Sequence, residues 1–205
     1  MKFRTVTSIE CTDDDGNEFD LTFRPVDDTL EIVKTDTGYE ARYLVQDEDA
    51  QNPTDMDCDD DGLFLVNYHR DFDVRHGKII TMEQVRNYYR GDEEDMPEGY
   101  WFFKMSMLSH SGVWLALDNR LDQYYMGFDA SHVGLVCVSK SEWPEEDKAR
   151  EAAESLVEEW NQYLSGDVYG IVKETYDKDR KQIDKESVWG FYGFEYAKEA
   201  LKTDI

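Results

Sequence analysis

Four residues in the first third of the chain match the opening of a calcium-binding loop. Asp57, Asp59 and Asp61 alternate and Gly62 follows them, as in the first half of an EF-hand, where alternate carboxylates face one cation. The second half does not match, because the twelfth position requires a bidentate Glu and falls on Tyr68. No cofactor is therefore expected, and binding of Ca²⁺ or Mg²⁺ by Asp57, Asp59 and Asp61 is the alternative.

The histidines and cysteines lack the spacing of a metal site or a nucleophilic centre. His110 lies between Ser109 and Ser111, but neighbouring residues of a strand point to opposite faces, so His110 cannot readily activate either hydroxyl. The sequence contains no HExxH, CxxC, P-loop or GxGxxG pattern. We expect no catalytic residue from these groups, which favours a binding protein over an enzyme.

Acidic residues outnumber basic ones by about two to one, 47 against 22, and the formal net charge is -25. B-DNA carries one negative charge per about 1.7 Å, so a surplus of this size equals the phosphates on about 12 base pairs. Such a field repels nucleic acid and attracts basic grooves. Mimicry of nucleic acid, metal binding, and acidity that serves only solubility or salt adaptation are the three interpretations.

The acids concentrate in two polar segments, residues 46 to 62 and residues 91 to 99, both predicted to be loops. Clustered carboxylates in these loops can steer the protein towards a channel lined by Lys and Arg. The residues predicted to bind a basic partner are Asp47, Glu48, Asp49, Asp55, Asp57, Asp59, Asp60, Asp61, Asp92, Glu93, Glu94 and Asp95.

Alternation of apolar and polar residues predicts the strands around these loops. Residues 2 to 45 have the pattern of an antiparallel meander. Further strands are predicted at residues 63–68, 100–108, 113–117, 132–138, 167–174 and 187–192. The charged residues 175–186 are expected to connect the last two of these strands.

Helical spacing is clearest after Pro144. Ala149, Ala153, Val157 and Trp160 recur at three- and four-residue intervals, which predicts a long amphipathic helix at about residues 144–164. Two shorter helices are predicted at 81–89, which opens with a capping box, and at 194–202. The predicted fold class is α+β, mainly antiparallel sheet with one long helix and two shorter helices.

Composition and linker pattern set the expected organisation. Apolar residues make up 40% of the chain and aromatic residues 14%, which is enough to build a core. No repeat or Pro/Gly-rich linker divides the sequence, so a single domain over residues 1–205 is expected. The alternative is a β-rich region over residues 1–95 followed by an α+β region over residues 96–205.

The absence of a signal peptide pattern and of a long apolar run favours the cytoplasm and no membrane contact.

Aromatic residues are concentrated at residues 100–103, YWFF, and at residues 189–193, WGFYG. Such groups usually pack in the core, where each large ring buries much apolar surface. An interaction surface built on stacked aromatic rings is the alternative.

Six segments occur in order between residues 49 and 193: DAQNPTD, NYHRDFD, HSGVWLAL, GFDASHVGLVCVSK, WNQYLSGDVYGIVKE and SVWGFYG. Together they resemble a widespread family of proteins carried by bacteriophages and integrated elements. The resemblance implies a phage or mobile-element origin. It implies no activity and no catalytic residues.

Phages also encode small acidic proteins that occupy the nucleic-acid grooves of restriction enzymes and CRISPR effectors, and this chain is similar to them in size and charge, not in sequence motif. We therefore predict a phage-encoded inhibitor of a host CRISPR-Cas or restriction system, acting by DNA mimicry or steric block. The expected partner is a basic nucleic-acid-binding host protein or nuclease complex, with no direct binding of nucleic acid. The alternatives are a divalent-metal-binding enzyme or accessory factor in phage DNA metabolism, and a phage protein that is acidic only for solubility.

Overall fold

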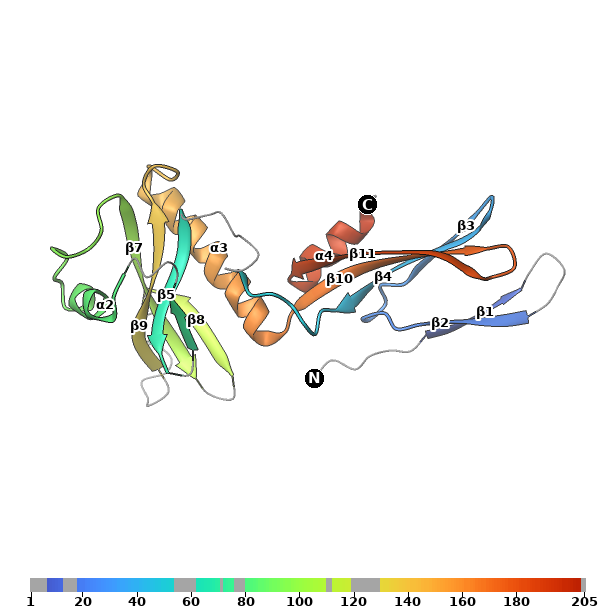
Figure 1. Cartoon of the computed structure of the whole chain (residues 1–205), viewed down its shortest axis with the longest axis horizontal. Helices are drawn as coiled ribbons and strands as arrows, with labels where there is room; N and C mark the ends of the chain where they lie inside the picture. Colours follow the sequence, from blue (N-terminus) through green and yellow to red (C-terminus); the bar gives the residue numbers. More distant parts are fainter. Residues whose placement is uncertain are drawn as a thin grey trace. The chain divides into compact units, whose positions relative to one another are not determined.

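The structure is a computed structural model that describes residues 7–12, 18–53, 62–70, 72–75, 80–109, 112–118 and 130–203. The chain forms two compact units (Figure 1). Unit 1 consists of Met1–Ala50 and Gly166–Ile205, and unit 2 consists of Gln51–Ser165. Compact units of this kind are defined by contacts and need not fold independently, so the expectation of a single domain stays a prediction.

Unit 2 is built on a five-stranded antiparallel sheet. Its strand order is β6 (Phe72–Arg75), β5 (Leu63–His69), β9 (Ala130–Ser139), β7 (Tyr100–Ser109) and β8 (Val113–Leu117). Helix α3 (Glu146–Ser165) covers one face of this sheet, and helix α2 (Met82–Tyr89) lies on the other (Figure 1). The result is a layer of sheet between two helices.

Side chains of alternate residues in the central strands point to opposite faces of this sheet. Leu65 and Val136 pack in the cluster under α3, whereas Phe64 and Leu135 pack in the cluster under α2. Because both faces are covered, these strands are apolar at nearly every position. This explains why the β5 and β9 segments contain continuous apolar runs.

Both helices of unit 2 have the buried faces that the sequence predicts, and α3 begins at Glu146, two residues after the predicted start. In α2, the Thr81 side chain accepts a hydrogen bond from the Gln84 backbone and the Gln84 side chain accepts one from the Thr81 backbone, which forms the capping box. In α3, Ala149, Ala153 and Trp160 are buried against the sheet. The long helix predicted at about residues 144–164 is thus confirmed.

Unit 1 contains a four-stranded antiparallel sheet in the order β11 (Gln182–Tyr192), β10 (Val168–Asp177), β4 (Gly38–Gln46) and β3 (Glu31–Thr35). Helix α4 (Phe194–Lys202) packs on one face through Ala197 and Leu201, and Phe23 packs on the other. Strands β1 (Thr7–Thr12) and β2 (Glu18–Phe23) form a separate antiparallel pair.

Strands β10 and β11 extend into the charged segment 175–186, which the sequence predicts to be a connection. They pair up to Tyr176 and Gln182, so the turn between them is short. Opposite charges face each other across the pair: Lys173 lies opposite Glu186 and Glu174 lies opposite Lys185. Cross-strand ion pairs of this kind support strand structure in a segment with little apolar content.

These elements confirm the α+β class with mainly antiparallel sheet. The two shorter helices predicted at 81–89 and 194–202 are α2 and α4. Over the described ranges, no helix is both long and apolar enough to cross a bilayer.

Candidate partner-binding site

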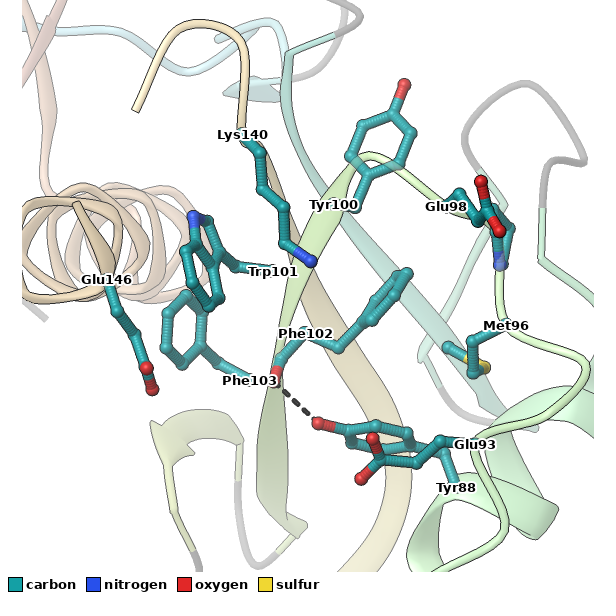
Figure 2. Close-up of a pocket in the computed structure, with 11 residues that line it drawn as sticks. Tyr88, Glu93, Met96, Glu98, Tyr100, Trp101, Phe102, Phe103, Lys140 and Glu146 are labelled. Carbon is teal, nitrogen blue, oxygen red and sulfur yellow. Dashed lines mark hydrogen bonds between the residues drawn. The ribbon is translucent and has the colours of Figure 1, made fainter. Parts of the chain in front are cut away.

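A pocket of about 390 Å³ opens in unit 2 beside the first half of β7 (Figure 2). Its walls come from the end of α2, the loop that follows α2, strand β7, the turn after β9 and the start of α3. The lining residues are Tyr88, Glu93, Met96, Pro97, Glu98, Tyr100, Trp101, Phe102, Phe103, Lys140 and Glu146.

The pocket lies where β7 extends past its pairing with β8. The register pairs β8 with Met105–Ser109, so residues 100–103 precede that pairing. The hydroxyl of Tyr88 donates a hydrogen bond to the carbonyl oxygen of Phe102 at 2.9 Å and joins α2 to this end of the strand (Figure 2). Beside it, the Tyr89 hydroxyl bonds to the backbone of Met105 and Gly134, where the register of β7 and β9 shifts.

Backbone and side-chain hydrogen bonds hold the pocket walls together. The Lys140 backbone N–H donates to the Gly99 carbonyl at 2.8 Å, which links the turn after β9 to the loop before β7. The Trp101 indole N–H donates to the Trp143 carbonyl at 2.9 Å. The loop after α2 is tied to the helix because the Gln84 side chain donates to the Asp95 carbonyl at 2.6 Å.

Two lysines lie over aromatic rings of this region. The Lys140 ammonium is 4.6 Å from the centroid of the Trp101 ring. The Lys104 ammonium is 5.4 Å from the centroids of both Tyr88 and Tyr89. These distances are within the range of cation–π attraction, so the ring faces of this region attract positive charge.

Three carboxylates line the pocket, two from the loop after α2 and one from the start of α3. Glu93 lies beside Tyr88, Glu98 lies on the side of Met96, and Glu146 projects from α3 on the side of Trp101 (Figure 2). Burial raises the pKa of Tyr88, and the negative charges of Glu93, Asp118 and Glu146 raise it further. Acidic side chains from the loop after α2 and from α3 thus act together on the tyrosine that lines the pocket.

The acidic surface continues beyond the pocket on both segments that form it. One segment follows α2, the other leads into α3, and all nine of their carboxylate side chains are exposed: Asp92, Glu93, Glu94, Asp95, Glu98, Glu142, Glu145, Glu146 and Asp147. Within the described ranges of the chain, none of the nine forms an ion pair with a Lys or Arg side chain. Their charge is thus available to an external partner.

The structure locates seven of the twelve residues predicted to bind a basic partner. Asp92, Glu93, Glu94 and Asp95 are exposed in the loop after α2, and Glu93 lines the pocket. Asp47 is half-buried while Glu48 and Asp49 are exposed, all three after β4 in unit 1. The remaining members, Asp55, Asp57, Asp59, Asp60 and Asp61, lie outside the described residues.

The three candidate metal ligands are among those outside the described residues. Gly62, which follows them, is buried, and β5 starts at the next residue, so a strand stands where an EF-hand loop would continue. Among the described residues, no group of three or more His, Cys, Asp or Glu side chains is arranged to hold a metal ion. Cys137 is a buried thiol, and burial raises its pKa well above the usual range.

Sequence reasoning does not place Glu98, Lys140 or Glu146 among the site residues. Glu98 lies in the acidic loop 91–99, but Lys140 and Glu146 follow β9 and join the site only through the fold. The aromatic run at 100–103 is the signal that the sequence offers, since three of its four rings are only partly buried and all four line the pocket.

Comparison of the chain with protein-family models, with curated proteins and with solved structures finds no match.

Proposed function

We propose that the chain is an acidic inhibitor that binds a basic, nucleic-acid-binding partner in place of nucleic acid. The partner class is a host defence nuclease, either a CRISPR effector or a restriction enzyme, and the chain originates from a phage or a mobile element. The proposal depends on one observation: the acidic segments 92–98 and 142–147 meet at one pocket in unit 2 and leave nine exposed carboxylates without an ion pair among the described residues.

In the sheet of unit 1, acidic side chains form ion pairs, unlike the nine exposed carboxylates of unit 2. This difference supports assignment of the docking surface to unit 2. Glu40 forms ion pairs with Arg42 at 2.7 Å and with Lys173 at 3.6 Å. Glu174 forms one with Lys185 at 3.0 Å. Neutralised pairs contribute little field at a distance, whereas uncompensated carboxylates of one sign add to each other's field.

Electrostatic attraction gives this surface a mechanism. The nine exposed carboxylates of these two segments steer the protein towards a channel lined by Lys and Arg, and contact releases counterions from both surfaces. A nuclease occupied in this way cannot bind its DNA. Inhibition should therefore be stoichiometric and should weaken as salt rises.

The direct test is competition between the chain and labelled DNA for purified CRISPR effectors and restriction enzymes. The test variant neutralises the loop after α2: Asp92→Asn, Glu93→Gln, Glu94→Gln and Asp95→Asn. The matched control removes the same charge from exposed acids elsewhere: Asp28→Asn, Asp36→Asn, Glu158→Gln and Glu195→Gln.

We expect wild-type protein and the control to displace DNA from a susceptible nuclease, and the test variant to lose most of this effect. Displacement should also fall strongly between about 50 and 200 mM salt, as for other contacts dominated by phosphate-like charge. Equal loss in both variants would assign the effect to net charge alone. Failure of the wild-type protein to displace DNA from any of these nucleases would refute the proposed function.

A further inference from the structure

The pocket of unit 2 has a negative formal charge and aromatic rings in its walls. Among the lining residues, Glu93, Glu98 and Glu146 contribute three negative charges and Lys140 one positive charge, which gives the lining a formal charge of -2. Lys104 and Arg150 do not line the pocket, but they lie over the Tyr88 and Phe103 rings. A charge of this sign disfavours anionic ligands, and the ring faces can stack with a weakly hydrated cation. The chemistry of the lining therefore selects a cation.

The ring faces already bind positive charge from the chain itself. Lys140 lies 4.6 Å from the centroid of Trp101, on an exposed side chain that extends from the turn after β9 (Figure 2). Its backbone is fixed by the bond to Gly99, but within the described residues its ammonium is held by an aromatic face and not by a carboxylate. An exposed lysine of this kind can move aside at modest cost when a better cation arrives.

A guanidinium group fits these walls better than an ammonium group. It is planar, it is more weakly hydrated, and it stacks on aromatic rings while its five N–H donors point outwards in the plane. The carboxylates of Glu93, Glu98 and Glu146 line different sides of the pocket and attract a guanidinium, whose N–H donors can bond to the carboxylate that they reach (Figure 2). Proteins that bind nucleic acid contact its phosphates with many arginine side chains, so the proposed partner can supply a guanidinium group.

We propose that this pocket binds the guanidinium group of an arginine presented by the partner, stacked on Trp101 in place of Lys140. The inference rests on the proposed function for the source of the arginine and extends it by naming the chemical group and its docking point. The surrounding acids steer the partner, and the pocket anchors it.

The test titrates the full chain with N-acetyl-arginine amide and, separately, with N-acetyl-lysine amide, at low salt. Binding is followed by NMR through the indole N–H signal of Trp101, with Trp189 of unit 1 as the internal reference. Two pairs of exposed neighbours supply matched variants: Glu93→Gln against Glu94→Gln, and Glu146→Gln against Glu145→Gln. In each pair the first residue lines the pocket and the second does not.

We expect the arginine probe to shift the Trp101 signal and to bind more tightly than the lysine probe. Glu93→Gln and Glu146→Gln should each weaken binding of the arginine probe by about three- to fivefold. Glu94→Gln and Glu145→Gln should change it by less than about twofold, because these exposed carboxylates do not line the pocket and solvent screens their charge. Equal binding of both probes, or equal effects within each pair of variants, would overturn the inference and leave the DNA-displacement result untouched. Conversely, probe binding at Trp101 without DNA displacement would uphold the pocket and reject the proposed function.

Discussion

The side-chain amide of Asn161 pairs with both backbone groups of Leu115. Its oxygen accepts a hydrogen bond from the Leu115 N–H at 2.8 Å, and its nitrogen donates one to the Leu115 carbonyl at 2.9 Å. Asn161 is 6% exposed on α3, and Leu115 is in the middle of β8. The helix therefore completes the hydrogen bonding of a strand, and one polar residue fixes how α3 packs on the sheet.

Asn161→Ala should destabilise the protein by about 2–4 kcal/mol, because it leaves a buried N–H and a buried carbonyl without their partner and also removes buried volume. Urea unfolding measures this loss. Glu158→Ala, on the exposed side of the same helix, is the matched control and should change the free energy of unfolding by less than about 0.5 kcal/mol. A loss for Asn161→Ala no larger than that of the control would contradict the role given to the amide.

Gly38→Ala should destabilise unit 1 by about 1–3 kcal/mol through overpacking. A Cβ at this position would lie 1.9 Å from the carbonyl oxygen of Tyr176, which belongs to the backbone of the adjacent strand β10 and cannot rotate away. Gly112→Ala is the control, because a Cβ there meets no atom within 4 Å. Thermal or urea unfolding of the two variants should separate them, and similar stabilities would be evidence against this close approach of β4 and β10.

The tyrosines around Glu174 should make stability fall at alkaline pH. Burial, followed by the charge of Glu174, raises the pKa of Tyr43, and burial together with a hydrogen bond to Glu174 at 2.7 Å raises the pKa of Tyr176. Below a pH of about 10 both phenols keep their protons in the folded and unfolded states, so their contribution to the free energy of unfolding is fully present. Above it the unfolded chain loses protons that the folded chain retains, and stability declines with rising pH.

The measurement is the free energy of unfolding in urea between about pH 8 and pH 11. Each retained proton contributes a slope of about 1.4 kcal/mol per pH unit, so Tyr43→Phe should give a shallower decline than the wild type. Glu174→Gln should also reduce the slope, because it removes the charge that opposes phenolate formation. Parallel curves for all three proteins would exclude this cluster as the source of the alkaline effect.

Lys140→Ala should increase the affinity of the pocket for the arginine probe by about three- to fivefold. The substitution removes the ammonium that lies over Trp101 and makes the pocket more negative, while the backbone bond from residue 140 to Gly99 is retained. NMR titration measures the change, and Lys148→Ala, on an exposed residue that does not line the pocket, is the control. Weaker binding by Lys140→Ala would mean that Lys140 supports the ligand and does not compete with it.

The α3 helix shows what a sequence determines by local rules. Spacing of Ala149, Ala153, Val157 and Trp160 predicts both the helix and its buried face, because side chains three and four residues apart share one side of a helix whatever surrounds it. The strands and the capping box at Thr81 are predictable for the same reason. Net charge is likewise a property of composition alone, so its sign and size follow without any knowledge of the fold.

The site was decided by tertiary structure. Glu93 and Glu146 are 53 positions apart in the sequence and line one pocket only because β7 and β9 pair and bring the loop after α2 beside the start of α3. Unit 1 likewise combines two distant segments, Met1–Ala50 and Gly166–Ile205, which are joined by the pairing of β4 with β10. Local pattern carries no information on such long-range pairing, because any apolar strand can satisfy the same alternation and the choice of partner depends on the packing of the whole core.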